Sequence, residues 1–266
     1  MEAKNIINVA LIQMQQVQCD IDQNIAHLRL ILEHTALDEI DLLLLPEMWT
    51  TGFVTKMETG ISDAYDRGLN IMKELSKNYG CAVYGSLLKV LDGGKLANAG
   101  VFLDVSEGVQ EEYHKVHLFG PGGEAKFFEA GNKRCMVSWR GWNIFLTICY
   151  DLRFPVWMRY SDEIPYDMIL CTANWPYPRQ EAWKALLRAR AIDNQAYVLG
   201  CNRVGQGPKT LLYPGDSVIA GPKGDLLHEI IRDEECVIKV SLDRCEVKGF
   251  RNSFPVLQDA DIFKLL

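Results

Sequence analysis

Three side chains that could perform acyl-transfer chemistry stand far apart in the sequence, each at the end of a strand-like run: Glu47, Lys115 and Cys149. Residues 142–148, just before the cysteine, are apolar and rich in β-branched and aromatic types, which predicts a strand buried on both faces. Pro155 follows soon afterwards and fixes φ, so regular hydrogen bonding between strands ends before it. A rigid strand that ends in a turn can expose a nucleophilic thiol and point backbone N–H groups past it.

A free thiol with a pKa of about 8.5 is only a few per cent ionised at neutral pH, so it needs a base or a cation beside it. Glu47 can take the thiol proton and later return it to a departing amine. Lys115 can stabilise the thiolate and, with the backbone N–H of Tyr150, bind the oxyanion of a tetrahedral intermediate. Water would then hydrolyse the thioester, with Glu47 again as base. This chemistry requires no metal and no organic cofactor.

Each of these side chains also has a structural explanation. Most free cysteines are small buried hydrophobes, and a strand-end Glu or Lys is usually a solvated surface group or part of a weak ion pair at the rim. His114 and His117 bracket Lys115 and suggest a rival Cys-His dyad. Strand alternation, however, points both histidines away from Lys115.

Several longer blocks carry a family resemblance: LPEMWTTGF, YHKVHLF, CYDLRFPVW, ANWP, ARAIDNQAYV and GDS. They resemble the ω-amidase branch of the nitrilase superfamily of carbon–nitrogen hydrolases, over essentially the whole chain. The resemblance implies a catalytic triad of Glu47, Lys115 and Cys149, with Glu124 as a second carboxylate hydrogen-bonded to the lysine. It also implies an α/β fold, a four-layer α-β-β-α sandwich with two mixed sheets, and homodimers or higher homo-oligomers. One departure is Val156, where many relatives carry Glu after Arg-Phe-Pro.

The implied substrate is a small dicarboxylic monoamide such as 2-oxoglutaramate or 2-oxosuccinamate, hydrolysed to the dicarboxylate and ammonia. Arg153 can bind the substrate carboxylate, because its planar guanidinium can donate two parallel hydrogen bonds to a carboxylate. Alternatively, it can pair with Asp151 or another acid. Five further residues could shape the substrate pocket or belong to the core: Phe53, Phe119, Tyr150, Asn174 and Trp175.

Three alternative functions remain open at this point. The chain could be another carbon–nitrogen hydrolase, such as an aliphatic amidase, an N-carbamoyl amidohydrolase or a nitrilase. It could be a binding protein without catalysis on the same fold. It could also be a thiol redox protein, although the nearest candidate resolving thiol in this region, Cys171, is distant from Cys149 in sequence.

Composition narrows the class of protein. We expect one domain over residues 1–266, since an α/β domain of this length is ordinary. The net charge of −7 argues against a nucleic-acid partner. The apolar runs are strand-sized and the first residues lack a signal-peptide pattern, so we expect no membrane association. The eight cysteines show no C-x-x-C and no zinc-ligand spacing, which favours reduced thiols in the cytoplasm and no metal site.

The spacing of apolar residues predicts the elements that must position these groups. Asp20 predicts a helix cap, followed by an apolar stripe at Ile21, Ile25, Leu28 and Leu32. We expect further helices over 62–79 and 179–193, and a late hairpin joining 217–220 to 236–242. The expected strands are 6–14, 42–45, 81–88, 98–105, 110–114, 142–148, 167–172 and 196–201. The glycine-rich loop 120–124 lacks the Gly-Lys-Ser/Thr ending of a phosphate loop, and the tail from Asp243 matches no pattern. Periodicity does not decide between one sheet and two.

Overall fold

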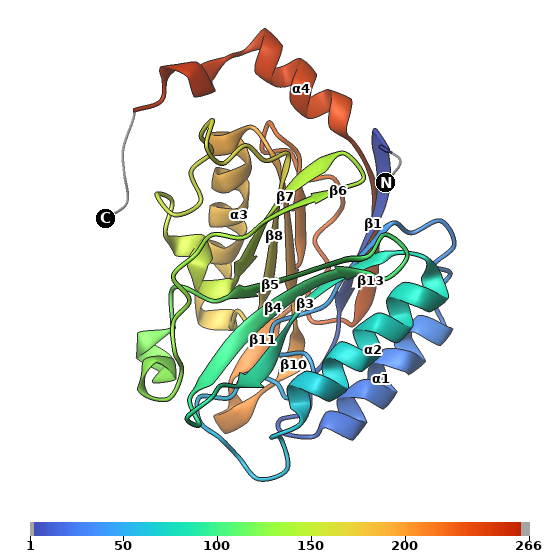
Figure 1. The fold of residues 1–266 in the computed structure, drawn as a ribbon, viewed down its shortest axis with the longest axis vertical. Coiled ribbons are helices and arrows are strands. Elements are labelled where there is room, and N and C mark those ends of the chain that lie inside the picture. The colour runs from blue at the N-terminus through green and yellow to red at the C-terminus, as the bar shows by residue number, and fades with distance from the viewer. Residues whose placement is uncertain (1–2, 262–266) are drawn as a thin grey trace.

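The computed structural model describes residues 3–261, which form two mixed β-sheets and four α-helices (Figure 1). The first sheet contains β1 (Ile6–Gln13), β2 (Leu42–Leu44), β3 (Ala82–Val90), β4 (Leu96–Asp104), β5 (Val109–His114) and β13 (Cys236–Asp243). The second contains β6 (Met136–Trp139), β7 (Trp142–Ile148), β8 (Met168–Ala173), β9 (Tyr197–Asn202) and β12 (Val218–Ala220). The helices are α1 (Ile21–Glu33), α2 (Ala64–Tyr79), α3 (Gln180–Asn194) and α4 (Arg244–Ser253).

The two sheets pack face to face, with α1 and α2 on the outside of the first sheet and α3 on the outside of the second (Figure 1). Strand order is β13-β1-β2-β3-β4-β5 in the first sheet and β12-β9-β8-β7-β6 in the second. Each sheet has parallel strands at its centre and antiparallel strands at its edges. The predicted four-layer α-β-β-α sandwich with two mixed sheets is therefore confirmed.

The central strands are nearly continuous apolar runs because both of their faces are covered. In β1, Val9 and Leu11 face the second sheet, whereas Ala10 and Ile12 pack toward the helices. The hydroxyl of Tyr84 donates to the carbonyl of Thr147 at 2.8 Å and so joins the two sheets directly. Successive side chains point to opposite faces of a strand, and both faces are buried here. The sequence of a central strand is therefore a continuous apolar run instead of an alternation of apolar and polar residues.

The first helix begins, and the second ends, where a sequence signal predicts. The carboxylate of Asp20 accepts a hydrogen bond from the backbone N–H of Gln23 at 2.9 Å, which caps α1. The predicted stripe of α1 is buried: Ile21, Ile25, Leu28 and Leu32. Helix α2 ends at Gly80, whose φ of 61° lies in the left-handed region that glycine tolerates best.

The predicted late hairpin is wrong. Strand β12 pairs antiparallel with β9 in the second sheet, whereas β13 pairs along its whole length with β1 in the first. The turn at 221–224 closes locally, because the N–H of Leu227 returns to the carbonyl of Ile219 at 3.0 Å. The chain after this turn then crosses from one sheet to the other. Both strands were expected, but they lie in different layers.

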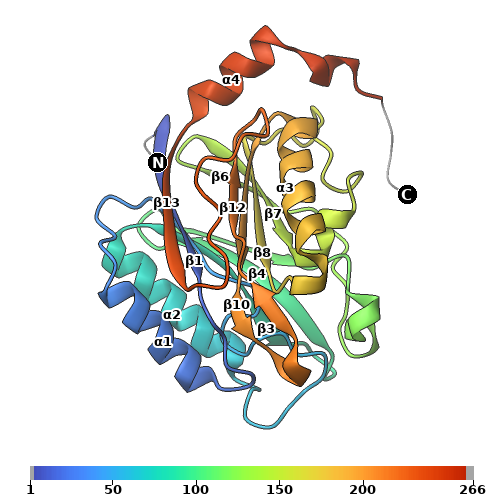
Figure 2. The ribbon, with the colours of Figure 1, turned by 180° about the vertical axis from the view of Figure 1, so that it is seen from behind.

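The segment that follows Asp243 forms α4, which the sequence patterns did not predict. The carboxylate of Asp243 caps this helix by accepting from the N–H of Cys245 at 2.8 Å. Arg251 anchors it by donating to the carbonyls of Tyr166, Asn194 and Gln195. Figure 2 shows α4 lying across one end of the sandwich, at the opposite end from the ribbon formed by β10 (Val204–Gln206) and β11 (Leu212–Pro214). Strand β6 and this ribbon were also not predicted.

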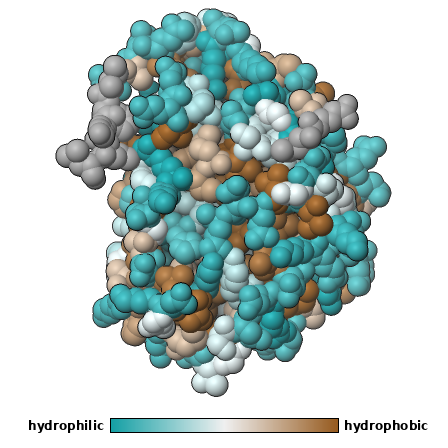
Figure 3. All heavy atoms as spheres, in the orientation of Figure 1, coloured by the Kyte–Doolittle hydropathy of each residue, from teal (hydrophilic) through white to brown (hydrophobic). Residues whose placement is uncertain are grey.

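The face drawn in Figure 3 is largely hydrophilic, with apolar side chains in small scattered groups. Within the described residues, no helix has both the length and the apolar character needed to cross a bilayer.

Candidate active site

The predicted site residues converge where strands of the two sheets end together. Glu47 follows β2, Lys115 follows β5, Cys149 follows β7 and Asn174 follows β8. Two hydrogen bonds tie these ends together across the sandwich. The Thr172 hydroxyl donates to the carbonyl of Leu45 at 2.7 Å, and the N–H of Asn174 donates to Oε2 of Glu47 at 2.8 Å. Groups that are distant in sequence thus share one buried space at the carboxyl ends of the central strands.

The carboxylate of Glu47 is fully buried and held at both oxygens. Oε1 accepts from Nζ of Lys115 at 2.9 Å and from Nδ2 of Asn98 at 2.8 Å. Oε2 accepts from the N–H of Asn174 at 2.8 Å. Glu47 and Lys115, both predicted as site residues, are therefore in direct contact.

Lys115 lies between two carboxylates. Its Nζ is 2.9 Å from Oε1 of Glu47 and 3.0 and 3.2 Å from the two oxygens of Glu124. Burial disfavours the ammonium, but Glu124 and Glu47 outweigh it and raise the pKa of Lys115 well above its usual value. Glu124 also accepts from the N–H of Phe119 at 2.6 Å. Lys115 is therefore a fixed positive charge at neutral pH, and Glu124 contacts it as predicted.

Cys149 is the first residue of a 3-10 turn (Cys149–Arg153), with a φ of 47°. A non-glycine residue in this region is sparsely populated and is often found at functional turns. Burial, reinforced by the Glu47 carboxylate, raises the pKa of the Cys149 thiol well above its usual value, and Lys115 opposes this only in part. The N–H of Asn174 also interacts with the sulfur. Cys149 thus carries a protonated thiol beside a carboxylate.

Asp151 joins the cysteine turn to the segment that carries the lysine. Its Oδ2 accepts from the N–H of Ile148 at 2.9 Å and from the hydroxyl of Tyr113 at 2.8 Å. Its Oδ1 accepts from the N–H of His117 at 3.0 Å and lies 2.7 Å from Nδ1 of the same residue. Asp151 is fully buried and is paired with His117, so it is not the partner of Arg153.

The two histidines have structural partners of their own. The His117 ring stacks on Phe154, with centroids 3.8 Å apart, and Nε2 of His114 lies 2.7 Å from Glu112. Within residues 3–261, neither ring makes a hydrogen bond to Cys149 or an interaction with Lys115. The rival Cys-His dyad therefore lacks the contact through which it would work.

The predicted substrate-binding residues lie around this cluster in different roles. The Arg153 guanidinium stacks on the Trp175 ring at 4.9 Å and has no acidic partner among the described residues. The Phe119 ring meets the Tyr150 ring edge-on at 5.1 Å. The Lys115 ammonium lies over the face of the Phe53 ring, 5.5 Å from the ring centroid. Asn174, in contrast, donates through Nδ2 to the carbonyl of Glu47 at 2.5 Å and so holds the Glu47 backbone in place.

Comparison with known proteins identifies the family. Residues 8–252 match the carbon–nitrogen hydrolase family. The chain is a carbon–nitrogen hydrolase. It is 39% identical to omega-amidase YafV of Escherichia coli K12 over 97% of this chain and 98% of that protein. It is 33% identical to 2-oxoglutaramate amidase of Bacillus subtilis, over 82% and 84% of the two chains. The resemblance to the ω-amidase branch of the nitrilase superfamily is thereby confirmed.

The fold comparison agrees with the sequence comparison. The structure superposes with a TM-score of 0.89 on XC1258 of Xanthomonas campestris, a CN-hydrolase superfamily protein crystallised with an arsenic adduct in its active site. The two chains are 33% identical, and the match covers 98% of this chain and 100% of the other. The likeness thus extends from the overall sandwich to nearly every element of this hydrolase.

Two polar residues of the site were not predicted from the sequence. Asn98 donates to Glu47 from inside β4, and Asn202 holds the Trp175 backbone by accepting from its N–H at 2.7 Å and donating to its carbonyl at 3.0 Å. Each is an amide side chain inside, or at the end of, a largely apolar strand. That pattern is the signal that could have identified them.

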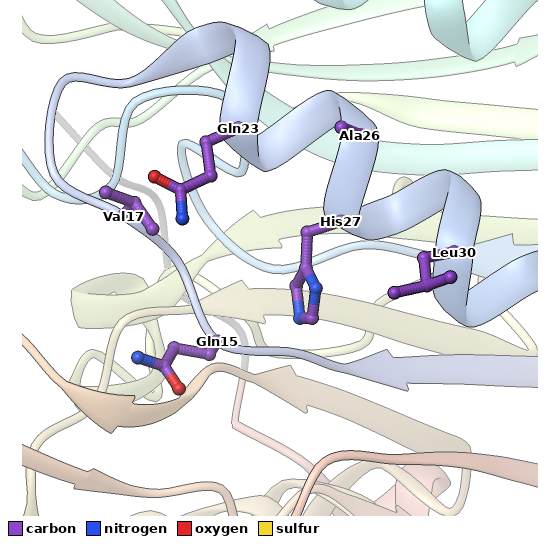
Figure 4. A pocket seen from close by; sticks show the side chains of 6 residues that line it. All are labelled: Gln15, Val17, Gln23, Ala26, His27 and Leu30. Carbon is purple, nitrogen blue, oxygen red and sulfur yellow. The ribbon is translucent and has the colours of Figure 1, made fainter.

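A separate surface groove of about 380 Å³ lies between α1 and the segment that precedes it (Figure 4). Its lining is Gln15, Val17, Gln23, Ala26, His27 and Leu30, which includes none of the predicted site residues. Among residues 3–261, no group of three or more His, Cys, Asp or Glu side chains is arranged to hold a metal ion.

Replacing Asp151 with asparagine should destabilise the protein by about 2–4 kcal/mol, because one oxygen that accepts two hydrogen bonds becomes a donor facing other donors in a buried site. Urea unfolding would measure the loss. Asp193→Asn is the matched control, since the Asp193 side chain that pairs with Arg190 is 45% exposed and its replacement should cost at most about 1 kcal/mol. Equal effects of the two substitutions would contradict the joining role of Asp151.

Proposed function

We propose that this carbon–nitrogen hydrolase is an ω-amidase that cleaves the terminal amide of a small dicarboxylic monoamide, such as 2-oxoglutaramate or 2-oxosuccinamate. The products are the dicarboxylate and ammonia. The observation that carries the proposal is the buried cluster of Glu47, Lys115 and Glu124 beside the Cys149 thiol. The names of the relatives support the substrate class, since they are an omega-amidase and a 2-oxoglutaramate amidase.

The first half-reaction forms a thioester. Glu47 removes the thiol proton as Sγ of Cys149 attacks the amide carbon, and the carbonyl oxygen takes up the negative charge. Lys115 and the backbone N–H of Tyr150 bind this oxyanion, which preorganised donors stabilise strongly in a buried site. Glu47 then delivers the proton to the amide nitrogen, the C–N bond breaks and ammonia leaves. Because the resting thiol is protonated, the transfer to Glu47 belongs to the chemical step.

The second half-reaction uses water. Glu47 takes a proton from a water molecule that attacks the thioester, and the same donors bind the new oxyanion. Collapse of this intermediate releases the carboxylic acid and returns the proton to the Cys149 sulfur. Glu124 supports both steps by holding the Lys115 ammonium in one position, with contacts at 3.0 and 3.2 Å.

A panel of substrates tests the reaction class. We expect ammonia release from 2-oxoglutaramate and 2-oxosuccinamate, and we expect acid-quenched enzyme to carry the mass of the acyl group on one cysteine. Turnover restricted to nitriles or to N-carbamoyl compounds would overturn the substrate assignment, while leaving the hydrolase family intact.

Arg153 is proposed to bind the free carboxylate of the substrate, while its guanidinium stacks on the Trp175 ring. Arg153→Met keeps the apolar stem but removes the charged fork. We expect kcat/KM for the dicarboxylic monoamide to fall about 10- to 100-fold, as loss of a charge-assisted hydrogen-bonded pair predicts. A neutral amide of the same length should lose little. Arg188→Met is the control, because Arg188 is exposed on α3 and bonds the carbonyl of Gly224. An equal loss for both substrates would contradict this role.

Three further properties are also proposed, each from a separate observation. Residues 1–266 form one carbon–nitrogen hydrolase domain, which the family match over 8–252 supports. The protein works in the cytoplasm, which its free cysteines support. It forms a homodimer or higher homo-oligomer, which the exposed apolar side chains of Ile192, Phe254 and Val256 support. Light scattering of the purified protein would test the last of these, and a monomeric mass would contradict it.

A further inference from the structure

Asn98 touches both the base and the lysine of the proposed reaction. It lies on β4 with 1% of its surface exposed, in a strand whose residues are all buried. Its backbone carbonyl accepts from the N–H of Lys115 at 3.0 Å. Its side-chain Nδ2 donates to Oε1 of Glu47 at 2.8 Å. One residue therefore fixes the start of the Lys115 segment and the Glu47 carboxylate at once.

The two oxygens of Glu47 are not equivalent. Oε1 accepts two hydrogen bonds, from Lys115 and Asn98, and Oε2 accepts one, from the N–H of Asn174. An ionised carboxylate has about two acceptor sites on each oxygen, so Oε1 is fully occupied and Oε2 retains one free site. Only Oε2 can take a further proton without first losing a partner.

The position of the sulfur agrees with this asymmetry. The N–H of Asn174 that donates to Oε2 also interacts with the sulfur of Cys149. The thiol and Oε2 therefore have the N–H group of Asn174 as a shared neighbour. This shared neighbour, together with the free acceptor site, favours Oε2 as the oxygen that receives the Cys149 proton.

The orientation of the Asn98 amide is determined by Glu47, because an amide oxygen placed against Oε1 would repel it. With Nδ2 facing Glu47, the buried Oδ1 has no hydrogen-bond partner in the described structure. Leaving a buried acceptor unpaired costs stability, whereas an apolar side chain of the same shape would avoid this cost. The donor at this position thus serves Glu47 and not the packing of β4.

We propose that Asn98 is a positioning residue that, together with Lys115, occupies Oε1 of Glu47 and so makes Oε2 the atom that exchanges protons with Cys149. The proposal rests on the acyl-enzyme reaction described above. Loss of the Asn98 donor removes one hydrogen bond that favours the ionised carboxylate and frees Oε1 to compete for the proton. The reaction then loses the orientation of its base and one of the donors that favour the charged form of this base.

The test is the pH dependence of acylation, measured as single-turnover ammonia release from 2-oxoglutaramate by the full-length protein. In Asn98→Leu, which keeps the size of the side chain, we expect acylation at neutral pH to fall about 10- to 100-fold. We also expect the acid limb of the profile to move upward by about one pH unit, because a hydrogen bond to the charged form is lost. Asn98→Ala should shift the limb in the same direction and decides the question if Asn98→Leu fails to fold.

The matched control is Asn24→Ala. Asn24 is equally buried and bonds the backbone of Val17 and Thr50, outside the cluster. Its loss should lower the unfolding temperature and leave the acid limb where it is. An acid limb unchanged from wild type in a folded Asn98 variant, whatever its rate, would overturn the proposal and leave Asn98 a packing residue. Failure of the wild type to release ammonia would instead overturn the reaction itself.

Discussion

Cys149→Ala is expected to abolish ammonia release while the fold survives. The substitution removes the sulfur that forms the thioester in the proposed reaction, so no acylated protein should be detected by intact mass after quenching. The cavity that it opens is small, because a methyl group replaces a thiol at a turn that is already partly open, with 9% of the residue exposed. Alanine keeps a Cβ, so the strain at φ of 47° is no greater than in the wild type. Circular dichroism and thermal unfolding would establish that the variant is folded.

The control for this variant is another buried thiol. Cys81 is 1% exposed, lies away from the Glu47 cluster, and burial raises its pKa to about 12. Cys81→Ala should cost some stability and keep full turnover. If Cys149→Ala retained turnover and Cys81→Ala lost it, the assignment of the nucleophile would be wrong.

Lys115→Met is expected to lower the rate of acylation by at least about 10²-fold, because an oxyanion donor and the only buried cation of the cluster are removed. The structure adds a complication, since Glu47 and Glu124 would then be two buried carboxylates without a counter-charge. Leaving buried charge uncompensated typically costs about 3–5 kcal/mol of stability. A loss of activity in this variant could therefore reflect unfolding as well as chemistry.

The double variant Lys115→Met/Glu124→Gln separates these effects. It removes one carboxylate together with the cation, and glutamine can still accept from the N–H of Phe119. We expect stability to recover in large part and acylation to remain at least about 10²-fold slow. His117→Ala should keep most of the rate, because its ring bonds Asp151 and stacks on Phe154. A His117→Ala loss that equals the Cys149→Ala loss, with Lys115→Met near wild type, would mean that the wrong base has been named.

The protonation state of the cysteines bears on the redox hypothesis. Reactive redox cysteines are thiolates in electropositive, partly exposed surroundings. Burial raises the pKa of Cys171 to about 12 and that of Cys149 well above its usual value. Both are therefore thiols at neutral pH. In the proposed reaction, attack by Cys149 depends on a proton transfer to Glu47, which suits an amide substrate held in place and not a freely diffusing oxidant.

The sequence by itself determined the elements whose signals are local. Strand β7 has the predicted bounds, because an unbroken apolar run and a turn signal lie within a few residues of each other. Helix α1 begins after Asp20 and buries its predicted stripe, because capping and helical spacing are short-range properties. The family could be inferred from its blocks, and the triad was assigned through that resemblance and not from spacing.

Only the tertiary structure decided which of these elements meet. Lys115 lies 68 positions from Glu47 in the chain, and Asn98 lies 51 positions from it. No periodicity spans such separations, since the pairing depends on how two sheets stack. For the same reason β12 and β13, read as a hairpin, belong to different sheets, and Asp151 pairs with His117 and not with Arg153. A buried polar side chain finds its partner through long-range packing, and the local sequence around Asn98 or Asp151 does not encode that partner.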